Sequence, residues 1–93
     1  MSPEETPPKP QRIAVIWSPE ARADVRAIDR ETALLVLHCL DRYMLNREGD
    51  VKKLKPPRTG FRLRCGDYRL FFDPHGENTI RITRVLNRRE AYR

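Results

Sequence analysis

Residues 61–72 read FRLRCGDYRLFF, two short runs of aromatic and aliphatic residues on either side of Gly66-Asp67. A two-residue connection of this kind predicts a tight β-hairpin. In that hairpin Cys65 stands opposite Tyr68, and the pairing continues outward to Phe61 opposite Phe72. Because side chains alternate between the faces of a strand, one face of the hairpin is apolar throughout. That face consists of Phe61, Leu63, Cys65, Tyr68, Leu70 and Phe72.

The other face of the predicted hairpin carries Arg62, Arg64 and Arg69 beside Phe71. A register shift of one residue would place arginines in the core, so the pattern specifies the register. The simplest interpretation of three arginines on a strand face is a solvated surface. However, Arg64 directly opposite Arg69 is destabilising unless an anion lies there, which favours an anion-binding surface.

Charge is distributed unevenly along the 93 residues, which carry a formal net charge of +6. Residues 1–50 hold seven Lys and Arg against nine Asp and Glu, a net charge of −2. Residues 51–93 hold twelve against four, a net charge of +8. This asymmetry indicates that the C-terminal half binds nucleic acid or another acidic partner. A membrane surface would attract the same charge, but no segment is long and apolar enough to span a bilayer, so we expect no membrane partner.

The length suits one domain with a modest core. Residues 1–11 contain four prolines among polar residues and are predicted to be a disordered tail, followed by a single domain over residues 12–93. The N-terminus lacks the apolar run of a signal peptide. Cys39 and Cys65 both fall in apolar patterns, which predicts buried thiols in a reducing, cytoplasmic compartment.

The elements before the hairpin are a strand and two helices. RIAVIW at residues 12–17 is apolar at almost every position, which predicts a strand covered on both faces. Ser18-Pro19-Glu20 is a helix start, with a hydroxyl cap and proline at the first helical position. A second helix begins near residues 29–32 and ends near Gly49, and its apolar positions recur at helical spacing. After the hairpin, residues 79–86 alternate as a strand.

The chain lacks established signatures of site chemistry. It has no glycine-rich phosphate loop and no His, Cys or carboxylate cluster at metal-ligand spacing. His38 and His75 lie in unrelated predicted elements and do not form a nucleophile–base pair. We therefore expect no cofactor and no metal. Arginine, lysine and tyrosine remain, and guanidinium groups bind phosphate oxygens and stabilise charge that grows on phosphorus.

A strand, two helices, VKKLK at 51–55, the GDYRL hairpin and a terminal NRREAYR at 87–93 occur here in that order. This combination resembles the RelE/ParE toxin superfamily of bacterial type II toxin–antitoxin systems over about residues 12–93. The resemblance implies a small single-domain α+β fold, in which an N-terminal strand and a helical pair pack on a curved antiparallel β-sheet. It also implies a cognate antitoxin protein as partner, in a toxin–antitoxin hetero-oligomer.

Members of the RelE-like branch resemble ribosome-dependent mRNA endoribonucleases, whereas ParE-like members inhibit DNA gyrase. The ribonuclease motif implies catalytic roles for Arg62, Arg64, Arg69, Arg88 and Tyr92. In that interpretation the messenger's own 2′-hydroxyl attacks the adjacent phosphate without a metal ion. Positions 62 and 64 are often lysines in the family, and because arginine carries protons poorly, the resemblance supports RNA binding without assigning an acid and a base.

Further RNA contacts are expected from exposed cations and an aromatic ring that can stack on an unpaired base. These residues are Lys52, Lys53, Lys55, Phe71, Arg81 and Arg89. The expected nucleic-acid partner is mRNA on the ribosome, with contacts to rRNA. Two alternatives stay open: a gyrase inhibitor without a hydrolytic site, and a catalytically silent basic domain that binds RNA or protein. The arginine and tyrosine set favours the ribonuclease.

Overall fold

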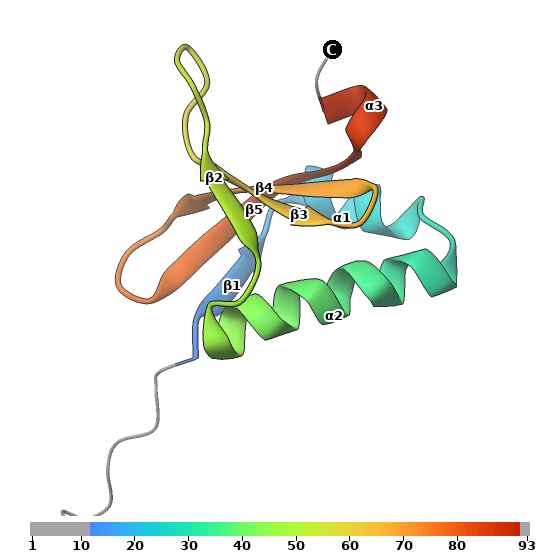
Figure 1. Ribbon diagram of the computed structural model, residues 1–93, viewed down its shortest axis with the longest axis horizontal. Helices are drawn as coiled ribbons and strands as arrows, with labels where there is room; N and C mark the ends of the chain where they lie inside the picture. The colour runs from blue at the N-terminus through green and yellow to red at the C-terminus, as the bar shows by residue number, and fades with distance from the viewer. Residues whose placement is uncertain (1–11, 92–93) are drawn as a thin grey trace, which may run out of the picture.

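The computed structural model describes residues 12–91, so the predicted tail at residues 1–11 and the candidate residue Tyr92 lie outside the described part of the chain. The described residues form an α+β fold in which α1 and α2 cover one face of a five-stranded sheet (Figure 1). The elements are β1 (Ala14–Trp17), α1 (Pro19–Arg26), α2 (Arg30–Asn46), β2 (Asp50–Lys53), β3 (Phe61–Cys65), β4 (Tyr68–Pro74), β5 (Thr79–Asn87) and α3 (Arg88–Ala91).

The sheet has the strand order β1-β5-β4-β3-β2 and is mixed. Strands β2 to β5 form an antiparallel meander, and β1 pairs with β5 in parallel. The predicted α+β fold, with helices packed on one sheet, is confirmed, and the pairing of β1 makes the sheet mixed. Helices α1 and α2 connect β1, at one edge of the sheet, to β2, at the other edge. Strands β2 to β5 then cross the sheet in order, so that β5 lies next to β1.

Strand β1 lies at an edge of the sheet, and its burial alternates along the strand. Ile16 remains 42% exposed because the helices cover only one face. The prediction of a strand covered on both faces is thus wrong. The prediction missed β2 as a strand, since VKKLK lacks alternation, yet Val51 pairs opposite Leu63 and extends the sheet.

The hairpin register is confirmed at every predicted pair, from Phe61 opposite Phe72 to Cys65 opposite Tyr68. Leu63 and Leu70 are fully buried, and the predicted apolar face packs into the core beneath α2. Gly66 begins the turn with φ of 60°, a left-handed conformation that glycine adopts without strain. The alternation of side chains therefore determined which face of the hairpin became core.

Helix α1 begins at the predicted cap, Ser18, and α2 begins within the predicted range, with Asp29 as its cap. The Ser18 hydroxyl accepts a hydrogen bond from the Ala21 amide at 3.0 Å, and Asp29 accepts one from the Thr32 amide at 3.1 Å. Hydrogen bonds from Thr32 hold the pKa of Asp29 below its usual value. Helix α2 ends at Asn46, with Arg47 in the left-handed conformation as its cap, a few residues before Gly49.

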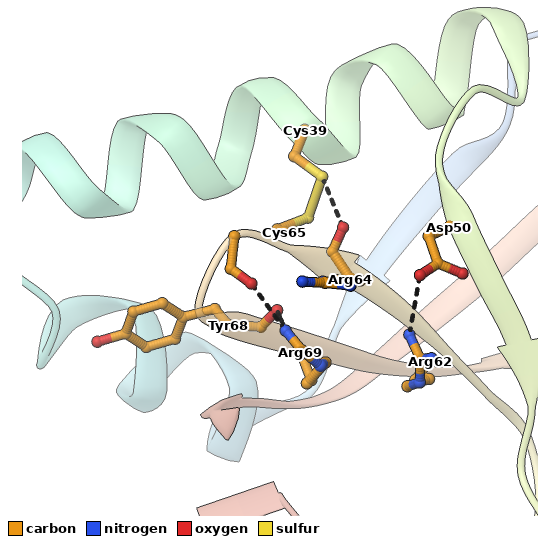
Figure 2. Close-up of a disulfide and its surroundings, with 8 residues drawn as sticks. Cys39, Asp50, Arg62, Arg64, Cys65, Tyr68 and Arg69 are labelled. Carbon is orange, nitrogen blue, oxygen red and sulfur yellow. Dashed lines mark hydrogen bonds and ion pairs between the residues drawn. A yellow bond between two sulfur atoms is a disulfide. The ribbon is translucent and has the colours of Figure 1, made fainter. Parts of the chain in front are cut away.

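Cys39 on α2 and Cys65 on β3 form a disulfide, with their Cα atoms 5.8 Å apart (Figure 2). Cys65 is buried, as predicted, but the prediction of two reduced thiols is wrong. Helical spacing places Cys39 on the side of α2 that faces the end of β3. The bond joins the helical layer to the hairpin directly beside Arg64, whose carbonyl oxygen lies 3.4 Å from the Cys39 sulfur.

Candidate nucleic-acid interface

The outer face of the sheet, opposite α1 and α2, carries two rows of the predicted site residues. One row runs from Lys52 through Arg62 to Phe71, and the next runs from Asp50 through Arg64 to Arg69. The connection at residues 54–60 and helix α3 both stand on this side of the sheet (Figure 1). The fold thus gathers cations from separate parts of the chain above one sheet surface.

Arg62 lies in the middle of this surface with its side chain only 12% exposed. Its Nη1 atom is 3.8 Å from Asp50 Oδ2 (Figure 2), too far for a hydrogen bond, and it has no hydrogen-bond partner within residues 12–91. A buried guanidinium N–H without an acceptor is costly. Phosphate and carboxylate oxygens are the strong acceptors for guanidinium groups, so this atom favours an anionic ligand.

Arg69 is 6% exposed, which contradicts the prediction of a solvent-facing side chain. Its Nη1 donates to the carbonyl oxygens of Gly66 at 2.8 Å and Tyr68 at 2.9 Å (Figure 2). Helix α3 packs on β4 and β5 at this end of the sheet. Alternation placed Arg69 on the outer face correctly, but the side chain supports the hairpin turn.

Phe71 was predicted to stack on RNA, but it is only 5% exposed. The guanidinium carbon of Arg58 lies 5.0 Å from the ring centroid, and Arg58 Nη1 donates to the carbonyl oxygen of Ala91 at 3.1 Å. The ring is therefore covered, and in this structure it does not present a stacking surface. Sequence reasoning missed Arg58; the available signal was an arginine directly after Pro56-Pro57 in the segment that leads into the hairpin.

Arg88 and Arg89 open α3 and are both exposed. The Arg88 amide donates to the Asp67 carbonyl at 2.7 Å, which joins the start of α3 to the hairpin turn. A pocket of about 430 Å³ lies here. Its lining consists of Asp67, Tyr68, Asn87, Arg88, Arg89 and Glu90. The first residues of the terminal basic motif therefore lie at the hairpin turn, and Tyr92 follows Ala91 outside the described residues.

The remaining predicted cations divide into two groups. Lys53 and Lys55 are both exposed where β2 enters the 54–60 connection. Lys53 pairs opposite Phe61, so alternation places it on the side of the sheet that faces the helices and not on the outer face. Arg81 pairs opposite Asp73 and Ile16, past the irregularity at Phe71/Phe72 and toward the other end of β5, so it stands apart from Arg88. Arg84 was not predicted; it donates to Asp24 on α1 at 2.8 Å, and this hydrogen bond raises the pKa of Arg84.

Over residues 12–91, no group of three His, Cys, Asp or Glu side chains is arranged to hold a metal ion. Within the same range no helix has the length and apolar character needed to cross a membrane. Most of the predicted site residues on the surface carry guanidinium or ammonium groups. Such a set binds phosphate and stabilises negative charge on it.

Comparison with known proteins relates this fold and surface to a toxin family. The family model described as ParE toxin of type II toxin-antitoxin system, parDE, matches residues 15–92. No curated protein sequence matches the chain.

Solved structures give the same relationship. The toxin–antitoxin complex RelBE2 from Mycobacterium tuberculosis contains a chain 29% identical, with a TM-score of 0.67, covering 82% of this chain and 98% of that one. The RelB–RelE antitoxin–toxin complex from Methanococcus jannaschii gives 26% identity and a TM-score of 0.60, covering 83% and 94%. The YoeB dimer from Staphylococcus aureus, 24% identical with a TM-score of 0.61 over 78% and 93%, shares the fold. The chain belongs to the RelE/ParE superfamily, on its RelE-like side, and is a toxin of a type II toxin–antitoxin system.

Proposed function

We propose that this toxin is a cytoplasmic, ribosome-dependent mRNA endoribonuclease that inhibits translation. The observation that carries the proposal is the buried Nη1 of Arg62, which has no hydrogen-bond acceptor within residues 12–91 and lies on a surface shared with Lys52 and Arg64. A phosphodiester supplies the missing acceptor together with the negative charge that these cations attract.

The proposed reaction uses the RNA's own nucleophile. The 2′-oxygen bonds to the adjacent phosphorus as its proton leaves, the bond from phosphorus to the 5′-oxygen breaks, and that oxygen takes up a proton. The products are a 2′,3′-cyclic phosphate and a free 5′-hydroxyl. Because the described surface holds no paired acid and base, the ribosome must orient the messenger for attack, a contribution that can be large.

The arginines have different roles in this proposal. Arg62, Arg64 and Arg88 bind the phosphate and offset its growing charge. Arg69, which donates hydrogen bonds to the hairpin turn and is buried, adds positive charge to the site. Tyr92 stacks on the base beside the cut or accepts the 2′-proton. Lys52, Lys53, Lys55 and Arg89 hold the RNA backbone or rRNA.

We also infer that a cognate antitoxin binds the toxin and forms a hetero-oligomer with it. The RelB–RelE and RelBE2 relatives were solved as antitoxin–toxin complexes. Residues 51–93 carry a net charge of +8. This charge is complementary to an acidic antitoxin segment that binds the outer face of the sheet.

Cleavage of mRNA on purified ribosomes, in the magnesium buffer that intact ribosomes require, tests the function. Wild-type protein should cut bound mRNA and leave cyclic-phosphate ends, while free RNA is cut poorly. Arg62→Ala should reduce cleavage by about 100-fold, as for loss of a preorganised donor. Arg22→Ala, on the opposite side of the sheet in α1, is the matched control and should cleave as wild type does.

The match to the ParE toxin family favours one alternative function, which is inhibition of DNA gyrase. A supercoiling assay with the same protein separates the two functions. Inhibition of supercoiling without cleavage of ribosome-bound mRNA would replace the ribonuclease with the gyrase inhibitor.

A further inference from the structure

We propose that the disulfide between Cys39 and Cys65 is a reversible thiol–disulfide exchange site, and that its redox state sets how long the folded toxin persists. The bond joins α2 to the end of β3 (Figure 2). Disulfides of proteins in a reducing cytoplasm are usually transient and serve catalysis or redox sensing. The inference rests on the proposed cytoplasmic function for its biological consequence, but its chemistry stands independently.

The two sulfur atoms differ in their access to solvent. Cys65 is 6% exposed, whereas Cys39 is half-buried. Cys39 lines two surface hollows of about 660 Å³ and about 290 Å³, and Cys65 lines the larger one. Exchange proceeds by attack of a thiolate on one sulfur of the bond, and its rate depends on access to that sulfur. Cys39 is therefore the sulfur that a reductant attacks.

Two arginines border the accessible sulfur. Arg42 of α2 and Arg64 of β3 line both hollows together with Cys39, and both side chains are exposed. The larger hollow also contains Asp67, and the smaller one contains Glu48. The charged side chains around Cys39 thus leave an excess of positive charge in each hollow. This charge attracts the thiolate of a reductant and stabilises the thiolate that Cys39 becomes.

The reduced pair also fits the fold. The Cys39 sulfur lies 3.4 Å from the Arg64 carbonyl oxygen, so a Cys39 S–H has a hydrogen-bond acceptor at the same position. Arg64 pairs with Asp50 of β2 and with Arg69 of β4, and these pairings hold it without the disulfide. Reduction therefore removes the covalent link between α2 and β3 and leaves the arginines of the outer face in place.

The reaction needs a dithiol reductant, for which a protein of the thioredoxin class is suited. A thiolate of the reductant bonds to the Cys39 sulfur, the Cys39–Cys65 bond breaks, and Cys65 leaves as a thiolate that takes up a proton. The second thiolate of the reductant then attacks its own sulfur in the mixed disulfide, and Cys39 is released and protonated. Two electrons and two protons pass from the dithiol to the cysteine pair, and the reductant ends as a disulfide.

The consequence is control of the lifetime of the toxin. Loss of a link between cysteines 26 residues apart should raise the population of unfolded toxin by about 400-fold in the loop-closure model. Proteases that cut the unfolded chain follow that population when opening and closing are fast. Reduced toxin should therefore be degraded faster than oxidised toxin, whereas kcat and KM for each folded molecule stay the same.

Three measurements on the full-length toxin in glutathione buffers test the inference. After a quench with iodoacetamide, mass spectrometry should find glutathione on Cys39 and the alkyl group on Cys65. Subtilisin should digest reduced toxin faster than oxidised toxin by about 400-fold. Cleavage of ribosome-bound mRNA should give the same kcat and KM in the reduced and the oxidised state.

Two sets of variants serve as controls. The Cys39→Ala/Cys65→Ala double variant should be digested at one rate in reduced and oxidised buffers. Arg42→Ala should slow the attack of glutathione, which carries a net negative charge, because it removes a cation from both hollows. Arg22→Ala, on α1, is the charge-matched variant and should leave the rate of attack unchanged. Equal slowing in both arginine variants overturns the hollows as the route of attack.

Glutathione found mainly on Cys65 overturns the inference, as does a disulfide that does not exchange. Equal digestion of the reduced and oxidised states overturns it as well. Loss of the native circular dichroism spectrum on reduction overturns it, because reversible exchange needs a folded reduced state. A change in kcat or KM on reduction would show that the bond controls the arginine surface, which also overturns it. If wild-type protein does not cleave mRNA, the proposed function fails, and exchange and digestion alone decide the inference.

Discussion

Three arginines on one predicted strand face have three different environments. Arg64 is exposed, Arg62 is mostly buried with an N–H that lacks an acceptor among residues 12–91, and Arg69 is buried with hydrogen bonds to the hairpin turn. Sequence alternation assigns all three to the same face. Helix α3 and the 54–60 connection cover part of this face. Their position then determines which of the three arginine side chains can contact a ligand.

Substitution of Arg69 separates a structural from a ligand-binding role. Arg69→Ala removes the two hydrogen bonds to the carbonyls of Gly66 and Tyr68 and should lower the free energy of unfolding by about 1–3 kcal/mol. Arg64→Ala removes an exposed charge opposite another arginine and should change it by less than about 0.5 kcal/mol. Urea unfolding of both variants measures the difference, and equal midpoints would show that Arg69 does not support the turn.

At the scale of elements, the site depends on segments that join the sheet from elsewhere. Helix α2 is fastened to β3 through Cys39 and Cys65, next to Arg64 and the hairpin turn. Helix α3 is fastened to that same turn through the Arg88 amide. The end of the hairpin is therefore the point where helical layer, sheet and C-terminal segment meet.

Removal of the disulfide should weaken the whole fold. Cross-linking residues 26 apart removes unfolded-chain entropy worth about 3.5 kcal/mol at 25 °C in the loop-closure model. Denaturant unfolding of wild-type protein should therefore show a loss of roughly that size when reductant is added. The Cys39→Ala/Cys65→Ala double variant is the control and should not respond to reductant. Wild-type protein that unfolds at the same midpoint in both conditions would contradict the prediction.

At the scale of the whole molecule, the functional surface is built almost entirely from the basic half of the chain. Residues 51–93 supply the hairpin, the 54–60 connection and α3, while residues 12–50 supply the helices behind the sheet and the edge strand β1. The basic half of the sequence therefore supplies the outer side of the sheet, and the other half supplies the helices on the opposite side. Arg84 of β5 forms an ion pair with Asp24 of α1 and links the two halves.

This arrangement predicts a salt dependence for RNA binding. Each phosphate contact that is lost should reduce the slope of the logarithm of the binding constant against the logarithm of salt concentration by about 0.7 for single-stranded RNA. Arg62→Ala should show that reduction in a titration with an mRNA fragment, whereas Arg22→Ala should keep the wild-type slope. An unchanged slope in Arg62→Ala would mean that its guanidinium does not meet a phosphate.

Much of the fold could be predicted from the sequence because local physical rules agreed with the tertiary structure. The Gly66-Asp67 turn and the alternation of residues 61–72 determined register and core face, since a shift of one residue would bury arginines. Ser18 marked a helix start because its side chain caps a free amide.

Other features were decided only when distant segments came together. The parallel pairing of β1 depends on where the meander returns, and the disulfide depends on α2 lying across β3, so neither has a local signal. The burial of Arg69 and Phe71 has the same origin, because a strand pattern specifies a face but not what later covers it. The contacts of Arg58 became visible only in three dimensions, since its two partners, Phe71 and Ala91, are separated from it by 13 and 33 residues of chain.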